Sequence, residues 1–207
     1  MSLPPPDLLP GEAAALAART TARAADEGIA QIVYARVDSP VGRLVAVATP
    51  RGLARIAYEL ENGGLDSILD DVALKLSPAI VEAPARLDPV RRELEEYFEG
   101  RREDFDVALD WSLTTGFRRR VLQQCARIPF GATSTYKEMA IAAGSPRAFR
   151  AAGGALGSNP IPIIVPCHRV LATGGGLGGY TGGLERKRQL LSIEDVTSTG
   201  GRRLRRS

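Results

Sequence analysis

A potential nucleophile and a potential base stand next to each other in this chain. Cys167 directly precedes His168, the only histidine of the 207 residues, and Arg169 follows. Thiolate is the nucleophilic form of cysteine, and a neighbouring imidazole, a guanidinium and backbone N–H groups can each favour it. Adjacent side chains of an extended chain point to opposite faces, so proton transfer requires a turn at Cys167 or a bridging water. The pattern favours a catalytic cysteine over a structural one.

The segments on either side of this pair must position it. Upstream, residues 159–166 read Asn-Pro-Ile-Pro-Ile-Ile-Val-Pro, a β-branched run that predicts a strand leading to Cys167. Downstream, residues 174–183 are rich in glycine but lack the Gly-Lys-Ser/Thr ending of a phosphate loop. They form either a flexible surface loop or a pocket wall, in which the backbone approaches a flat ligand and Tyr180 supplies an aromatic face.

A final helix is expected from Leu184 to about Ile193, with the charged residues 185–188 directed to solvent. The helix leads into Glu194. A carboxylate in this position is exposed by default, but Glu194 could instead orient His168, as the acid of a catalytic triad does.

Two short helices are expected before the Cys-His pair. Thr135 and Glu138 match a capping box, which predicts a helix that runs to Ala143 and ends at Gly144. Ser145 then predicts a cap and Pro146 a first helical position for a second helix, which runs to about Leu156. Two such helices form a helix-turn-helix. The second is mostly alanine and glycine, so its bare face can approach either the protein's own core or DNA closely.

The remaining periodicities complete an α+β fold. Strand patterns at 33–37, 44–47 and 53–58 predict a three-stranded antiparallel meander, and helices are expected at 66–76 and 88–98. A helix over about 115–127 carries Cys125 on its apolar stripe, where a buried thiol is favoured over a reactive one. We therefore expect a small N-terminal α/β unit with an antiparallel sheet, followed by a mostly helical domain with the helix-turn-helix. The expected parts are an N-terminal extension (1–30), an α+β domain (31–110), a C-terminal domain (111–195) and a basic tail (196–207).

Composition sets the class of protein. Hydrophobic residues make up 44% of the chain and charged residues 25%, as in ordinary globular proteins. No apolar run approaches the roughly 20 residues of a membrane span, and no secretory signal pattern opens the chain. Two cysteines suit a reducing compartment, and with one histidine they leave little for a zinc site. A soluble cytoplasmic protein without metal or cofactor is expected.

Charge is divided unevenly along the chain. Residues 1–110 carry 12 Lys and Arg against 20 Asp and Glu, a net of −8. Residues 111–207 carry 15 against 4, a net of +11. Such a basic half is the electrostatic pattern of a partner for phosphates, although Arg-rich helices can also simply be solvated. Nucleic-acid contact is therefore one of two interpretations of the charge alone.

Taken together, these motifs resemble those of the O6-alkylguanine-DNA alkyltransferases, also called methylated-DNA–protein-cysteine methyltransferases. The Pro-Cys-His-Arg-Val block at 166–170 resembles the active-site signature of that family. The resemblance extends to the Asn-Pro at 159–160, Gly-Gly-Tyr-Thr-Gly-Gly at 178–183 and Leu-Leu-x-x-Glu at 190–194. It covers residues 111–195 throughout, and the α+β unit before them looks like the family's N-terminal domain.

The resemblance implies DNA repair by direct damage reversal. The alkyl group of O6-alkylguanine, with O4-alkylthymine as a further candidate, would pass irreversibly to Cys167 after the base is flipped out of the duplex. His168 would deprotonate Cys167 through a water, and Glu194 would orient His168. The thioether is stable, so the protein would act once. No cofactor is implied, and the zinc ligands of some members have no counterpart here.

The same resemblance assigns the contacts with double-stranded DNA. The second helix would dock in the minor groove, Arg150 would fill the place that the flipped base leaves, and Tyr136 would help to rotate the nucleotide. Asn159 would brace the turn before the active site. The other implied contacts lie on the DNA-facing helix (Arg147, Ala151 and Gly153) and around the base pocket (Val170, Tyr180 and Thr181). A monomer in solution is expected, with cooperative binding on DNA left open and no membrane partner.

Phe149 departs from the family pattern, because a small residue is expected beside Arg150 and a phenyl ring alters how the helix enters the groove. Three other functions remain open at this point. A relative that senses alkylated DNA without transfer has its cysteine replaced, whereas Cys167 is present. A helix-turn-helix regulator leaves the Cys-His-Arg run and the glycine-rich segment unexplained. A cysteine hydrolase turns over a small substrate and has no need for a DNA-docking helix.

Overall fold

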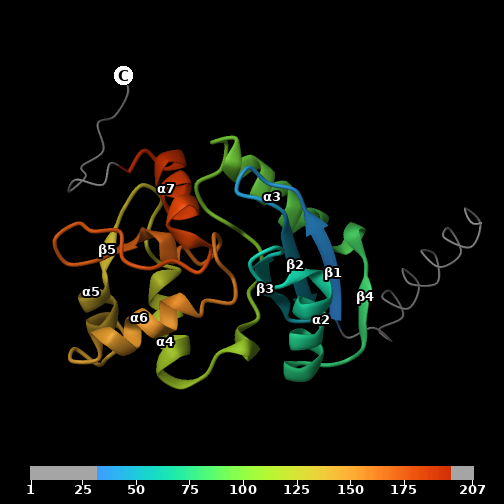
Figure 1. Cartoon of the computed structure of the whole chain (residues 1–207), viewed down its shortest axis with the longest axis horizontal. Coiled ribbons are helices and arrows are strands. Elements are labelled where there is room, and N and C mark those ends of the chain that lie inside the picture. Colours follow the sequence, from blue (N-terminus) through green and yellow to red (C-terminus); the bar gives the residue numbers. More distant parts are fainter. Residues whose placement is uncertain (1–31, 197–207) are drawn as a thin grey trace, which may run out of the picture.

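A four-stranded sheet organises the N-terminal half of the structure, a computed structural model that describes residues 32–196 (Figure 1). The predicted extension 1–30 and residues 197–207 of the predicted tail lie outside the described residues. The sheet order is β3-β2-β1-β4. Strands β1 (Ile32–Val37), β2 (Leu44–Thr49) and β3 (Gly52–Tyr58) form the predicted antiparallel meander. The short β4 (Ile80–Glu82) was not predicted and pairs in parallel with β1.

Strand β2 is buried on both faces, which explains its continuous apolar sequence. Val45 and Val47 pack with Ile68 and Val72 of helix α2 (Gly64–Lys75) on one side of the sheet. The alternate residues of β2 join the main core, which extends into the C-terminal half. Because side chains alternate across a strand, the sheet separates two apolar layers. The larger layer joins the two halves of the protein.

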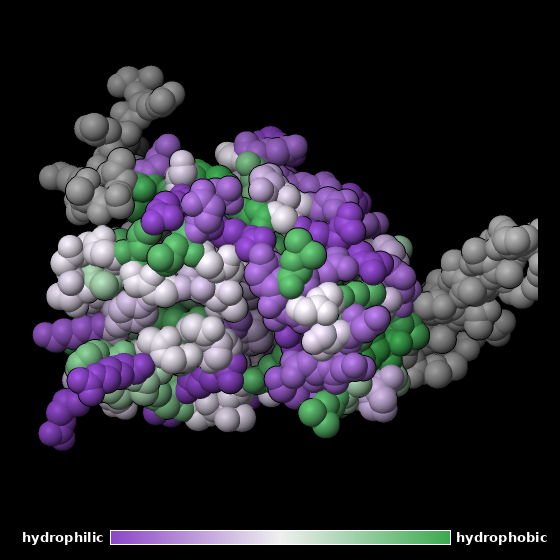
Figure 2. All heavy atoms as spheres, in the orientation of Figure 1, coloured by the Kyte–Doolittle hydropathy of each residue, from purple (hydrophilic) through white to green (hydrophobic). Residues whose placement is uncertain are grey.

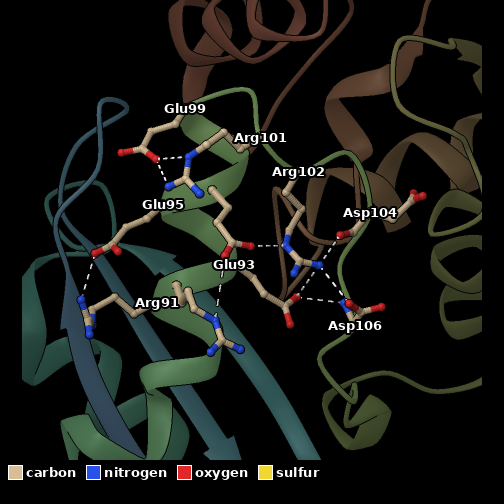
Figure 3. A network of polar contacts seen from close by, with 10 residues as sticks. Arg91, Glu93, Glu95, Glu99, Arg101, Arg102, Asp104 and Asp106 are labelled. Carbon is tan, nitrogen blue, oxygen red and sulfur yellow. Dashed lines mark hydrogen bonds and ion pairs between the residues drawn. The ribbon is translucent and has the colours of Figure 1, made fainter.

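Helix α3 (Asp88–Phe98) has the bounds that its apolar spacing predicts, and follows the 3-10 turn η1 (Pro84–Leu87). A polar network fastens the following connection to it (Figure 3). Buried Glu93 accepts the backbone N–H of Asp106 at 2.8 Å. Arg102 lies 2.8 Å from Glu96 and 3.0 Å from Asp106. The connection then pairs with the free edge of β3, where Leu53 N–H donates to Ala108 and receives the N–H of Asp110 at its own carbonyl, both at 2.8 Å.

The C-terminal half is helical, as predicted. Beyond the 3-10 turn η2 (Trp111–Leu113), helices α4 (Gly116–Cys125), α5 (Tyr136–Ala142) and α6 (Phe149–Gly157) pack together, and α7 (Gly183–Ile193) closes the chain. The short strands β5 (Ser134–Thr135) and β6 (Val170–Leu171) pair in parallel. The fold is thus α+β, with a sheet-containing N-terminal half and a helical C-terminal half lying side by side in Figure 1.

Local signals are confirmed at two of these helices. Cys125 is fully buried on the apolar stripe of α4. The capping box of α5 is present: Thr135 Oγ1 accepts the Glu138 N–H at 3.2 Å, and Glu138 Oε2 accepts the Thr135 N–H at 2.7 Å. Among residues 32–196, no helix is long and apolar enough to cross a membrane.

The start of α6 was predicted wrongly. Residues 145–148 form a turn in which the Ala148 N–H donates to the Ser145 carbonyl at 2.9 Å, and the helix begins only at Phe149. Pro146 suits the second position of such a turn as well as a first helical position. Ser145 therefore does not cap α6, whose N-cap position is Ala148 without a capping side chain.

Candidate active site

Cys167, His168 and Arg169 form a single 3-10 turn, η3, between the Pro-rich segment and β6. All three side chains are buried, with Cys167 4% exposed and His168 fully enclosed. The turn places these neighbours differently from an extended strand, in which successive side chains alternate. The turn at Cys167 is therefore present, but among the described residues His168 Nδ1 makes no hydrogen bond to Cys167 Sγ, so proton transfer between them requires a bridging water.

The segment before this turn is not the predicted strand. Residues 161–165 form successive turns, and Ile163 has a φ of 77°, a conformation rare for a β-branched residue. Pro160 and Pro162 have no N–H to donate to a ladder. The segment is anchored from the N-terminal half, since the Ile56 N–H of β3 donates to the Pro160 carbonyl at 2.8 Å.

Asn159 replaces the missing ladder. Its Oδ1 accepts the Ile161 N–H at 3.0 Å, and its Nδ2 donates to the Val165 carbonyl at 2.8 Å. The same Nδ2 lies 3.2 Å from Cys167 Sγ. The buried Asn159 amide therefore holds the turns together and contacts the sulfur directly.

Glu194 lies at the end of α7 and is fully buried, not exposed. Its Oε1 is 2.9 Å from His168 Nε2. Burial alone would favour the neutral acid, but hydrogen bonds from His168 and Arg169 outweigh it and lower the Glu194 pKa to about 2. Glu194 is therefore a carboxylate at neutral pH, so the proton of a neutral imidazole resides on Nε2, which donates to it.

The other ring nitrogen of His168 is available as a base. Nδ1 is buried and has no hydrogen-bond partner within residues 32–196. Burial lowers the His168 pKa, while the hydrogen bond to Glu194 opposes that change. The ring is thus neutral at physiological pH, with its lone pair on Nδ1. This is the protonation state that a general base requires.

Arg169 is paired with Glu194 rather than with the sulfur of Cys167. Its Nε is 2.9 Å from Glu194 Oε2 and its Nη2 is 2.9 Å from Oε1, a side-on bidentate pair. A further N–H donates to the Ile128 carbonyl. The guanidinium is therefore engaged by the carboxylate that holds His168.

Lys187 is the cation whose charge favours the thiolate of Cys167. Residues 185–188 were expected in solvent, yet Lys187 is fully buried, and Nζ donates to the carbonyls of Val170 (2.6 Å), Leu177 and Gly179 (3.3 Å). Burial lowers its pKa to about 8, with the charge of Cys167 opposing. Burial raises the Cys167 pKa to about 11, against the Asn159 hydrogen bond and the charge of Lys187. The resting site holds a thiol.

The sulfur opens onto a pocket of about 350 Å³. The lining residues come from four segments, namely α5, α6, the cysteine turn and the glycine-rich loop: Tyr136, Gly153, Leu156, Gly157, Cys167, Gly178, Gly179 and Tyr180. Tyr136 Oη accepts the Gly179 N–H at 3.2 Å. A Cβ at Gly178, whose φ is 64°, would lie on the Tyr136 hydroxyl. The glycine-rich segment is therefore a pocket wall rather than a free loop.

The N-terminal half supports this wall. Tyr58 of β3 is buried, and its hydroxyl lies 2.8 Å from that of Tyr180. The backbone of Gly182 packs so closely on the Tyr58 ring that a Cβ there would approach it to 2.5 Å. The guanidinium of Arg186 lies 4.7 Å from the centre of the same ring. Tyr58 thus lies behind the pocket. The sequence predicted only that this residue belongs to a strand, not that it supports the pocket.

The remaining candidate residues differ in whether they line the pocket. Val170 is buried in β6, with its carbonyl engaged by Lys187, and Thr181 is exposed and donates to the Gly157 carbonyl at 3.0 Å. Neither lines the pocket of Cys167. Gly153 lines it and faces Tyr136 from α6. Within residues 32–196, no group of three or more His, Cys, Asp or Glu is placed to hold a metal ion.

An exposed face adjoins the pocket on α6 and the turn before it. Arg147, Arg150 and Ala151 are exposed, and the Phe149 ring, 47% exposed, lies 5.7 Å from the Arg150 guanidinium. A Cβ at Gly154 would meet nothing within 4 Å. Figure 2 shows the helical half carrying pale, weakly polar residues over the region of the glycine-rich loop, with purple hydrophilic residues around them. On this face the positive charges of two arginines therefore lie beside a stretch of helix whose small side chains leave the backbone accessible.

Sequence patterns missed the buried hydroxyl of Tyr97, which donates to Glu194 Oε1 at 2.7 Å, and the buried ammonium of Lys187. The apolar stripe of α3 includes Leu94 and passes beside Tyr97, so burial of this ring was foreseeable. A buried phenol usually finds a hydrogen-bond partner. The identity of that partner, 97 residues away, was not foreseeable.

Two family models match most of the chain. The model described as "6-O-methylguanine DNA methyltransferase, ribonuclease-like domain" matches residues 32–111, and the DNA binding domain of the same description matches residues 116–196. A methylated-DNA–protein-cysteine methyltransferase of Methanosarcina barkeri is 36% identical over 162 residues, which are 78% of this chain and 96% of that protein.

Solved structures of proteins from the same family also resemble this chain. The crystal structure of a Mycobacterium tuberculosis O6-methylguanine methyltransferase superposes with a TM-score of 0.67 at 38% identity, covering 79% of this chain and 92% of that one. A structure of the M. tuberculosis protein in complex with DNA has a TM-score of 0.67 at 37% identity, with 78% and 92% covered. The similarity therefore spans both halves of the described chain.

Proposed function

The chain belongs to the 6-O-methylguanine DNA methyltransferase family, and on this premise we propose that it repairs DNA by moving the alkyl group of O6-alkylguanine onto its own Cys167. The observation that carries the assignment is the enclosed arrangement of Cys167, His168 and Glu194, with a free Nδ1 on the histidine and a pocket beside the sulfur. O4-alkylthymine is a second candidate substrate.

The exposed face of α6 is the proposed contact with double-stranded DNA. Arg147 and Arg150 supply positive charge, and Ala151 and Gly153 let the backbone approach the minor groove. Arg150 fills the place of the flipped nucleotide, because its planar cation can stack between bases. Tyr136 at the start of α5 helps to rotate the nucleotide into the pocket that it lines with Gly153. The cost of flipping is a few kcal/mol, which phosphate contacts offset.

The transfer step forms one bond and breaks another. The thiol proton of Cys167 passes through a water to Nδ1 of His168, and Glu194 stabilises the imidazolium that results. Cys167 Sγ then attacks the alkyl carbon, and the carbon–O6 bond breaks with its electron pair left on guanine. Guanine regains one proton, which balances the one lost by the thiol. Thioether formation leaves no ester for water to attack, so the protein acts once.

The ground-state thiol is consistent with this sequence. Burial holds the Cys167 pKa near 11, whereas the Asn159 amide and the Lys187 ammonium favour the anion. The thiolate therefore forms when a proton acceptor and an electrophile are both present. Val170 and Thr181 do not line the pocket, and we assign them to supporting positions around the base: the Val170 carbonyl binds Lys187, and the Thr181 hydroxyl donates to the Gly157 carbonyl.

We further propose that the two halves of the protein have different functions. Residues 111–195 bind DNA and transfer the alkyl group, and residues 31–110 support the pocket through Tyr58. We also propose that the protein acts as a monomer in solution. We place the protein in the cytoplasm, where bacterial-type DNA repair operates on the chromosome.

Mass spectrometry of the intact protein and its peptides tests this function. After mixing with a stoichiometric O6-methylguanine duplex, the protein is expected to gain one methyl group on Cys167 and no more. Buried Cys125 is the internal control, because it should stay unmodified. Cys167→Ser should keep DNA binding and abolish transfer. Tight binding without repair or modification would instead identify a lesion sensor.

A further inference from the structure

The carboxylate of Glu194 is held from both halves of the protein. Its Oε1 lies within 2.9 Å of three donors, namely His168 Nε2, Arg169 Nη2 and the hydroxyl of Tyr97, which is the closest at 2.7 Å. Tyr97 lies on α3 in the N-terminal half, and its ring is fully buried. The proposed proton relay therefore ends on a residue outside the domain that carries the cysteine.

We propose that Tyr97 is a positioning residue of the alkyl-transfer reaction: its hydroxyl donates to Glu194 Oε1 and so sets how strongly Glu194 holds a proton on His168. This inference rests on the proposed function of Cys167 and His168. Tyr97 acts through Glu194 and touches neither the sulfur nor the pocket.

Packing alone does not account for the hydroxyl. The Tyr97 ring lies in an aromatic cluster with Phe98, Phe105 and Phe130, at centre-to-centre distances of 5.4, 5.3 and 6.1 Å. A phenylalanine would make the same ring contacts. Only the oxygen reaches Glu194, and burial raises the Tyr97 pKa, so the hydroxyl stays protonated and acts as a donor.

The charged groups around His168 explain how the Tyr97 hydroxyl can influence the protonation of the imidazole. Glu194 approaches the ring from the end of α7, Arg169 from the same turn and Lys187 from α7, while the Tyr180 ring meets the imidazole edge-on at 6.3 Å. Burial and both cations disfavour the imidazolium, whereas the Glu194 carboxylate favours it. Each donor to Oε1 reduces the negative charge that the imidazole experiences. Tyr97 therefore helps to keep His168 neutral and Nδ1 available.

Removal of the hydroxyl should act on His168 in one direction. In Tyr97→Phe the carboxylate loses a donor, its charge acts more fully on the ring, and the His168 pKa should rise by about 0.5 to 1 unit. Because a protonated ring cannot accept the thiol proton, the acidic limb of the pH–rate profile should move to higher pH by the same amount. Above that limb the rate should remain close to that of the wild type.

The single histidine makes the measurement direct in the full chain. The Cε1–H resonance of His168 is followed against pH by NMR in the wild type and in Tyr97→Phe, and the alkyl-transfer rate is measured over the same range. Tyr34→Phe is the matched control, because Tyr34 packs against the α2 layer on the opposite face of the sheet. Thermal unfolding checks that both variants are folded.

A raised His168 pKa and a displaced acidic limb in Tyr97→Phe, both absent in Tyr34→Phe, would support the proposal. An unchanged His168 titration would overturn it, as would a rate that falls equally at every pH, since that is the result of a purely structural role. The NMR result does not require alkyl transfer. If the protein failed to transfer an alkyl group but the resonance shifted, the proposed function would fail while the link between Tyr97 and His168 stood.

Discussion

Replacement of Glu194 by glutamine should cost the protein about 3 kcal/mol of unfolding free energy at pH 7. The first argument is linkage. The Glu194 pKa falls from 4.5 to about 2 on folding, and about 1.4 kcal/mol per unit gives about 3 kcal/mol. The second is the ion pair. Loss of one partner of a buried pair costs roughly 3–5 kcal/mol, because it leaves the other charge uncompensated, here Arg169.

The pH dependence gives the same prediction a second observable. A lowered carboxyl pKa contributes stability that is fully present above about pH 4.5 and is lost progressively as the pH falls from about 4.5 to about 2. Urea unfolding curves of the wild type and Glu194→Gln, measured from pH 7 to pH 3, should therefore converge on the acidic side. Glu185→Gln is the matched control on the same helix, since its exposed pair with Arg188 at 3.4 Å contributes at most about 1 kcal/mol.

Two results would refute this reasoning. A loss below about 1 kcal/mol at pH 7 would mean that the charge of Glu194 is not held as the geometry indicates. Parallel wild-type and variant curves down to pH 3 would mean that the carboxyl does not titrate abnormally. A double variant, Glu194→Gln with Arg169→Met, should recover part of the loss because it removes the orphaned cation.

Two further changes separate the roles of the cations. Arg150→Ala should reduce flipping of the target base, read as 2-aminopurine fluorescence next to the lesion, more than it reduces binding; equal loss of affinity for damaged and intact duplex would make Arg150 a phosphate contact. Arg147→Ala is the comparison, expected to weaken both duplexes alike and to lower the salt slope by about one. Lys187→Met should raise the Cys167 pKa further, because a cation that favours the thiolate is lost. Alkyl transfer at pH 7 should then slow by about tenfold for each pKa unit gained, and a rate unchanged in stopped-flow assays would contradict that role.

Local chemistry in the sequence determines much of the fold. The capping box at Thr135 and Glu138 and the apolar spacing of α3 each depend on residues within one or two helical turns, so they could be read directly. The start of α6 could not, because Ser145-Pro146 suits a turn and a helix start equally well. The turns of residues 161–165 also escaped, since their β-branched composition favours a strand that Asn159 and two prolines prevent.

The candidate site likewise has a part that the sequence predicts and a part that it does not. Cys167 and His168 are adjacent, so their pairing is visible in the sequence, but the charges that tune them are not. Arg169 is directed to Glu194, 25 residues away, and Lys187 reaches the carbonyl of Val170, 17 residues away. An Arg or Lys side chain in a polar run is expected in solvent. Only tertiary packing shows which of them is buried and which charge it meets.

The enclosure of Cys167 also bears on how the protein survives before it acts. A protein used once cannot afford to lose its sulfur to a passing oxidant, and oxidation proceeds through an accessible thiolate. With 4% of the side chain exposed and a pKa near 11, this sulfur is mostly protonated and hard to reach at rest. The same packing that makes the site demanding to enter thus lengthens the useful lifetime of each unspent molecule.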